Sequence, residues 1–217
     1  MARFGQLPVE AVVASTPPEW AFDPQKVDVL YQPVYDRVNY AAAGATSLNF
    51  FSVALGGSAT LIRAGAAATV TKTRRDTNMV ASGSIPNEGF DWQGVGMVYV
   101  PLQQVPGVAA TNDIADDIQR IMYGGYFTFK VLDNTLLELP ILTIPSIISL
   151  GGLATGNDVM AVQPGKGDQK DAFWVTKKKF LPPNSSFTFT MNFDGTVSLS
   201  QTFDIYVFLL GEKYRPK

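Results

Sequence analysis

One short segment carries several oxygen-bearing side chains at a spacing that could hold a cation. The residues are Asn112, Asp113, Asp116 and Asp117. Oxygen atoms are the ligands that calcium prefers, but the glycine-bearing spacing of a calcium loop is missing. Acidic residues also favour the first turn of a helix without any metal, and Asn112 or Asp113 can cap such a helix. We interpret the segment as a helix N-terminus and expect no metal site.

Pairs of carboxylates are the second candidate chemistry. Asp133 with Glu138, or Asp91 with another acid, could form the two-carboxylate site of a glycoside hydrolase. The chain holds 19 Asp and Glu residues, so pairs of this kind arise without any function. We therefore expect no catalytic residues and keep hydrolysis only as an alternative.

Two basic clusters could bind phosphate. Lys177, Lys178 and Lys179 lie inside a strand pattern, so their side chains alternate between the two faces. Lysines in this position are typical of an exposed edge strand that is protected against further pairing. Arg74 and Arg75, together with Lys72, form a second cluster that we expect in a loop, facing a genome or an acidic neighbour.

The glycines form no phosphate-binding loop. Gly65, Gly94 and Gly96 lack the strand–loop–helix context that such loops need. Gly94 and Gly96 lie inside a strand pattern, where glycine admits a neighbouring backbone or a large side chain.

The chain of 217 residues contains no histidine and no cysteine. This composition excludes Ser–His–Asp hydrolysis, histidine-ligated metals, thiolate nucleophiles and disulfides. Charged residues make up 17%, against about 25% in an ordinary soluble domain. A surface poor in charge is tolerated where partners cover it. The net charge of −2 provides no basic field for nucleic acid.

The first 26 residues differ in composition from the remainder. They contain Pro8, Pro17, Pro18 and Pro24. Proline lacks a backbone donor, so we expect residues 1–26 to form an extended arm. Its apolar side chains, Trp20 among them, should lie on a surface, and we expect the arm to tie adjacent subunits together. Residues 27–217 should form one domain.

One helix is expected, over residues 113–123. Ile114, Ile118 and Ile121 recur at helical spacing, and the following glycines, Gly124 and Gly125, favour a helix end. We expect the three isoleucines to be buried.

The remaining patterns predict strands. The clearest strand covers residues 187–193, in which every odd position is large and apolar. Asp194 and Gly195 then favour a tight turn, with residues 196–200 returning as a hairpin partner. Residues 203–210 are apolar on both faces, which indicates a central strand. Further strands are expected at 27–31, 47–55, 90–100, 127–131, 137–141 and 173–181, with a long loop at 146–171.

About eight to ten strands with uneven connections are typical of an all-β sandwich. We predict a single jelly-roll β-sandwich with long loops and one short helix. A compact double jelly roll is the alternative, although two eight-stranded sandwiches would leave few residues for connections.

Three segments resemble capsid proteins of tailless icosahedral bacteriophages. They are the run from Thr73 to Met79, the turn from Gly83 to Asn87 with the strand after it, and the closing strand from Phe203 to Tyr214. The resemblance implies a jelly-roll shell subunit without catalytic residues, standing upright in a six-fold or pseudo-six-fold capsomer.

We therefore expect a viral coat protein, not an enzyme, with no cofactor. It should self-assemble into an icosahedral shell in the host cytoplasm and reside in the virion. Its partners should be copies of itself and other capsid proteins, with weak genome or inner-membrane contact and no small-molecule substrate. The alternative is a carbohydrate-binding β-sandwich module or a carboxylate-based glycan hydrolase. Such a site needs exposed aromatic residues, for which the candidates are Trp20, Trp92 and Trp174; of these we expect Trp92 in the core.

Overall fold

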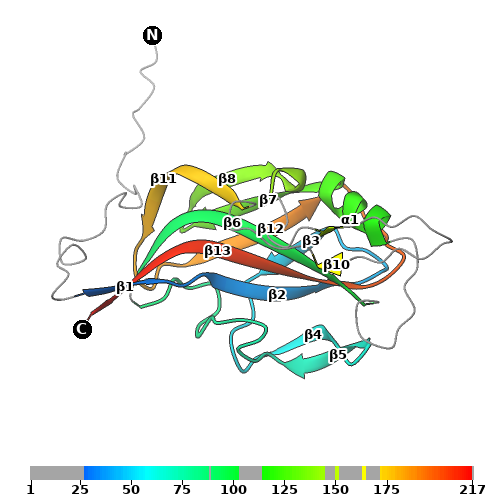
Figure 1. The fold of residues 1–217 in the computed structure, drawn as a ribbon, viewed down its shortest axis with the longest axis horizontal. Coiled ribbons are helices and arrows are strands. Elements are labelled where there is room, and N and C mark those ends of the chain that lie inside the picture. The colour runs from blue at the N-terminus through cyan, green and yellow to red at the C-terminus, as the bar shows by residue number, and fades with distance from the viewer. Residues whose placement is uncertain are drawn as a thin grey trace, which may run out of the picture.

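The chain forms an all-β sandwich of two antiparallel sheets with one short helix (Figure 1). The computed structural model describes residues 27–87, 89–102, 114–144, 150–151, 163–164 and 172–216. The expected arm over residues 1–26 and the expected helix caps, Asn112 and Asp113, lie outside the described residues. So does most of the expected loop at 146–171.

The first sheet is built around its last strand. It contains β1 (Val27–Tyr31), β2 (Val34–Tyr40), β6 (Phe90–Pro101), β11 (Phe173–Leu181) and β13 (Phe203–Pro216). On one side β13 pairs with β6, and on the other it pairs with β2 along its first half and with β1 along its second. The central position predicted for this strand is confirmed. β11 lies beyond β6 at the edge.

The second sheet has the order β3-β12-β7-β8. Its strands are β3 (Ser47–Phe50), β7 (Gly125–Val131), β8 (Asn134–Pro140) and β12 (Phe187–Phe193). The predicted hairpin between β12 and residues 196–200 is wrong, because β3 and β7 already occupy both edges of β12. The predicted strand at 47–55 is wrong beyond Phe50, since Phe51 has a φ of 60° and turns the chain out of the sheet.

The core lies between the two sheets. The alternation predicted for β12 is confirmed, because Phe187, Phe189, Met191 and Phe193 are buried while Thr188 is exposed. The ring of Phe189 stacks on Phe127 of β7 at a centroid distance of 5.4 Å. The facing residues of β13 are Phe203, Ile205, Val207 and Leu209, all buried.

The single described helix, α1 (Ile114–Tyr123), closes one end of the sandwich (Figure 1). Ile114, Ile118 and Ile121 are buried, as predicted. The helix ends where predicted, with the N–H of Gly124 donating to the carbonyl of Arg120 at 2.9 Å. A short 3-10 turn, η3 (Ile141–Thr143), packs against α1.

Two small pairs of strands complete the described structure. β9 (Leu150–Gly151) pairs with β10 (Gln163–Pro164). β4 (Ser58–Arg63) and β5 (Ala66–Thr71) form a hairpin that lies outside both large sheets (Figure 1). Its turn residues, Ala64 and Gly65, both have positive φ, which suits the tight turns of hairpins. The sequence patterns did not predict this hairpin.

Candidate functional site

A cluster of buried charges lies around β2, where the β4–β5 hairpin meets the first sheet. Arg37 is its centre and is only 2% exposed. Its Nε donates to Oδ2 of Asp204 at 2.7 Å, and its Nη1 donates to Oδ1 of Asp76 at 3.3 Å. The same guanidinium donates through Nη2 to the carbonyl of Ile62 at 3.1 Å, while the Ile62 N–H donates to Asp204 at 2.8 Å. The hairpin is therefore attached to the sheet through β4.

Asp36 forms the second half of the cluster, on the core side of β2. Its Oδ1 accepts from Nζ of Lys72 at 2.6 Å, and its Oδ2 accepts from the backbone N–H of Phe51 at 2.7 Å. Burial raises the pKa of Asp36, and the nearby ammonium of Lys72 offsets part of this rise. Asp36 thus fixes the turn at Phe51, whose backbone is in the left-handed region.

Asp76 organises the segment that follows β5. Its carboxylate accepts from the N–H and the hydroxyl of Thr73, at 3.0 and 3.1 Å, and from Arg63 at 2.5 Å. Burial alone would raise the pKa of Asp76, but these donors outweigh it and hold the pKa below its ordinary value. The start of the segment from Thr73 to Met79 is therefore held in a fixed conformation.

The cluster balances its charges. Its members are Asp36, Asp76 and Asp204 with Arg37, Arg63 and Lys72, which is three acids against three bases. A buried charge is tolerated when it is paired and hydrogen-bonded. Each acid already accepts several hydrogen bonds, so none is free to act as a base or a ligand. The cluster is a structural anchor rather than a reaction centre.

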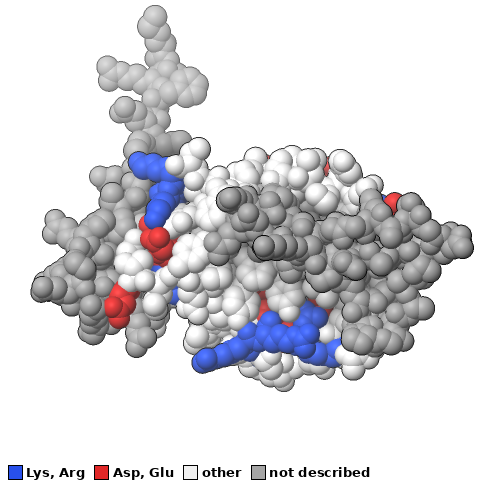
Figure 2. All heavy atoms as spheres, in the orientation of Figure 1, with Lys and Arg blue, Asp and Glu red and all other residues white. Residues whose placement is uncertain are grey.

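Lys72 was predicted to belong to a surface basic cluster, and this prediction is wrong because the side chain turns inward to Asp36. Arg74 and Arg75 do lie in an exposed loop, as predicted. The hydroxyls of Tyr35 and Tyr206 hold that loop, the first by donating to the carbonyl of Arg74 and the second to that of Arg75 at 3.3 Å. Figure 2 shows a band of Lys and Arg atoms in this region of the molecule.

The same segment continues into a groove of about 360 Å³. Its lining includes Met79, Val80, Ile85, Pro86, Asn184 and Lys213. Asn78 fixes its near end, because its side chain accepts from the N–H of Tyr35 at 3.0 Å and donates to the carbonyl of Pro33 at 2.8 Å. Val80 is 86% exposed although the neighbouring Met79 is buried.

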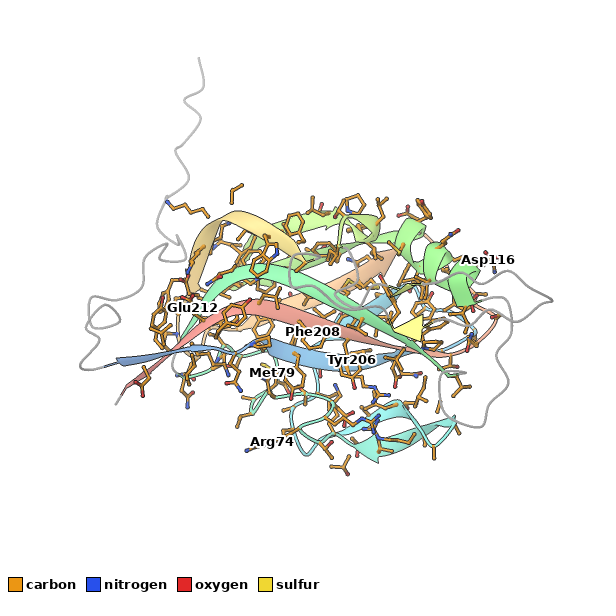
Figure 3. All side chains as sticks on the ribbon, in the orientation of Figure 1. Arg74, Met79, Asp116, Tyr206, Phe208 and Glu212 are labelled. Carbon is orange, nitrogen blue, oxygen red and sulfur yellow. The ribbon has the colours of Figure 1, made fainter. Side chains whose placement is uncertain are left out.

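Further apolar side chains are exposed on the adjoining strand. Lys213, which lines the groove, is the register partner of Leu30 on β1. Val29, Leu30 and Tyr31 are 52%, 41% and 46% exposed, so β1 presents apolar groups on both of its faces. We call Val29, Leu30, Tyr31 and Val80 the end patch. Glu212, the register partner of Tyr31, lies at the end of the molecule opposite Asp116 (Figure 3).

A shallow polar basin of about 320 Å³ lies on the outer face of the second sheet. It is lined by Tyr126, Thr128, Lys130, Glu138, Thr188, Thr190 and Asn192. Tyr126 is 39% exposed, and Glu138 and Lys130 point outward from neighbouring strands. This arrangement offers one aromatic ring beside hydroxyl, amide and charged groups.

The acidic residues considered as candidates lie on separate elements or turn to structural partners. Asp116 is exposed, whereas Asp117 is buried and accepts hydrogen bonds from the N–H and hydroxyl of Ser200. Asp91 is buried and accepts from the hydroxyl of Tyr214 at 3.2 Å. Within the described ranges, no three His, Cys, Asp or Glu side chains gather where they could hold a metal. Asp133 and Glu138 are both exposed on the β7–β8 hairpin.

The other predicted residues lie as follows. Lys177, Lys178 and Lys179 are on β11, which is an edge strand, as predicted. Trp92 is fully buried, as predicted, whereas Trp174 is 38% exposed and Trp20 lies outside the described residues. A Cβ on Gly94 would lie 2.5 Å from the carbonyl oxygen of Phe173, so this glycine does admit a neighbouring backbone.

Sequence reasoning missed Asp36, Arg37 and Asp204. The signal that could have found them is a charged residue inside an otherwise apolar strand, as in the run around Asp204. Such a residue needs a buried partner, but the sequence does not say which one.

Comparisons with family models, with curated proteins and with solved structures give no match. No described helix has the length and apolar character needed to cross a membrane.

Proposed function

We propose that this chain is a viral coat protein that builds an icosahedral shell by packing against copies of itself. The observation that carries the proposal is the end patch. Val80, at 86% exposure, lines the groove, and Val29, Leu30 and Tyr31 are exposed on β1, the strand whose Leu30 pairs with the groove residue Lys213. Clustered exposed apolar side chains of this kind mark interaction surfaces.

The order of strand pairing supports a jelly roll, a fold that viral shell domains and lectins use. Counted along the chain, the eight main sandwich strands are β2, β3, β6, β7, β8, β11, β12 and β13. The first pairs with the eighth, the second with the seventh, the third with the sixth and the fourth with the fifth. This is the pairing of one long antiparallel ribbon rolled into two sheets.

The chemistry of the chain favours a structural role over an enzymatic one. Histidine and cysteine are absent from the sequence, and the buried carboxylates of the charge cluster are committed to structural partners. Jelly-roll enzymes that hold a metal through imidazole need ligands that this chain lacks.

The test is self-association of the purified full chain, followed by light scattering and electron microscopy. The native chain should form rings or shells as its concentration rises. Val80→Asp should suppress them without lowering the melting temperature, because the side chain is solvent-exposed. Gln119→Glu adds the same charge on the exposed face of α1 and is the matched control. A native chain that stays monomeric across concentration, salt and pH would overturn the proposal.

The polar basin favours a second candidate function, which is glycan binding. Sugars bind where an aromatic ring lies beside polar groups, and Tyr126 lies next to hydroxyl and amide side chains there. A glycan array with the native chain should then show binding that Tyr126→Ala removes and Val80→Asp retains. Absence of binding on the array would eliminate this candidate.

A further inference from the structure

The outer strand of the β4–β5 hairpin has an open edge. Within the described part of the chain, β5 pairs only with β4, and β4 is the strand that contacts the sandwich. The sequence of β5 is Ala-Ala-Ala-Thr-Val-Thr, and all of its residues are exposed except the half-buried Val70. The strand thus reaches into solvent along its whole length.

The backbone of β5 offers unused hydrogen-bonding groups in a regular row. In an antiparallel pair, successive residues direct their N–H and C=O groups alternately toward and away from the partner strand. Ile62 directs both groups away from β5, toward Asp204 and Arg37. Its register partner Ala67 therefore directs both of its groups to the open edge, as do Thr69 and Thr71.

Open strand edges are normally protected by charge, proline, a bulge or short length. β11 carries three lysines and a register shift, and β8 carries Glu138, Pro140 and a register shift opposite it. β3 has only four residues, and β1 and β2 contain charged residues. β5 has no charge and no proline, and its pairing with β4 shows no register shift. β9 and β10 have only two residues each. Of the described edges, β5 is therefore the one left open to a partner.

We propose that β5 pairs in antiparallel fashion with β5 of a second copy of this chain, about a two-fold axis. This inference rests on the proposed self-assembly and names one of its contacts. Two hairpins then form one four-stranded sheet. An isolated two-stranded hairpin is only marginally stable, so the pairing stabilises both hairpins. In a two-fold contact both copies use the same surface, so β5 alone supplies both sides of the interface.

The side chains of β5 suit this pairing. With Thr69 on the axis, Thr69 of one copy lies opposite Thr69 of the other, and Ala67 lies opposite Thr71. Cross-strand Thr pairs are favourable, and no like charges face each other within the strand. The exposed Arg74 and Arg75 lie just beyond the strand, in the loop where Figure 3 labels Arg74.

The chain contains no cysteine, so a single introduced cysteine reports the contact directly. Hydrogen-bonded residues that face each other across antiparallel strands have Cα atoms about 5.5 Å apart, which a disulfide can span. Thr69→Cys should therefore oxidise to a covalent dimer on the order of tenfold or more faster than Thr60→Cys. Thr60 is the matched control because it is also exposed but lies on β4, directly across the hairpin.

A second pair of variants tests the contact without oxidation. Thr69→Lys places on β5 the kind of charge that protects β11, and Thr60→Lys places it on β4. We expect Thr69→Lys alone to reduce association in sedimentation velocity, with both variants retaining the native melting temperature.

The possible outcomes separate this inference from the proposed function. The β5 contact is overturned if the two lysine variants associate equally and the two cysteine variants oxidise at equal rates. The shell proposal is unaffected by that result. A native chain that is monomeric under all conditions overturns both. Rapid dimerisation of Thr69→Cys without larger assemblies supports the β5 contact and counts against the shell.

Discussion

Removing the carboxylate of Asp204 should strongly destabilise the fold. This side chain is fully buried and accepts hydrogen bonds from Nε of Arg37 at 2.7 Å, from the N–H of Ile62 at 2.8 Å and from Asn39 at 2.8 Å. In Asp204→Ala, the buried guanidinium of Arg37 keeps only Asp76 as a counter-charge. Breaking a buried ion pair from one side costs about 3–5 kcal/mol. In a chain of this size we expect the melting temperature to fall by roughly 10 °C.

The control is an ion pair of similar chemistry at the surface. Nζ of Lys178 lies 3.2 Å from a carboxylate oxygen of Glu212, and the two side chains are 54% and 26% exposed. Exposed pairs contribute about 0–1 kcal/mol, so Lys178→Ala should leave the unfolding free energy almost unchanged. Urea unfolding followed by circular dichroism measures both variants.

Hydrogen exchange then shows which strands lose stability in Asp204→Ala. In Asp204→Ala, exchange should accelerate first at Ile62 and across β4 and β5, because these strands lose their attachment to the sheet. Equal unfolding free energies for Asp204→Ala and Lys178→Ala, or protection of the hairpin equal to that of the native chain, would refute the anchoring role of the cluster.

Three further predictions concern pH, the core and the arm. Donors from Thr73 and Arg63 hold the pKa of Asp76 below 3.8 despite its burial, so the charged carboxylate stabilises the fold above that pH. The advantage of the native chain over Asp76→Asn in urea unfolding should therefore shrink as the pH falls through the folded-state pKa, and a constant advantage would contradict this. Phe189→Ala should lose about 3–5 kcal/mol and much of the soluble yield, because the ring is fully buried against Phe127; an unchanged melting temperature would be inconsistent with this packing. Deleting residues 1–24 should leave a folded β domain by circular dichroism that assembles poorly by microscopy, and normal shells from the shortened chain would exclude a role for the arm.

Apolar residues that recur every two positions in strands and every 3.6 positions in the helix predicted the buried side chains well. The alternation in β12 and the isoleucine spacing in α1 follow from which side chains must leave water, and both are confirmed. These signals are local, because each residue's neighbours in sequence are enough to reveal them.

Long-range partners were not predictable from the same patterns. The segment after Asp194 has the pattern of the second strand of a hairpin. The two edges of β12 are instead paired with β3 and β7, which are far away in sequence. Lys72 looks like part of a surface cluster, but its partner Asp36 lies on a different strand. The β4–β5 hairpin was missed because its alanine-rich outer strand buries almost nothing and so shows no alternation.

The buried anchor and the open edge of β5 are physically coupled. Apart from its charges, the hairpin has two buried apolar side chains, Leu61 and Ile62, both on β4. A strand that moves freely must lose conformational freedom when it pairs, and this cost weakens association. Arg37 and Asp204 hold β4, and through it β5, in a fixed position before any partner arrives. Linkage requires the converse as well, so pairing at β5 should stabilise the docked hairpin. Asp204→Ala should therefore slow the oxidation of Thr69→Cys even at temperatures where the sandwich itself stays folded, and an unchanged rate would show that the edge does not depend on its anchor.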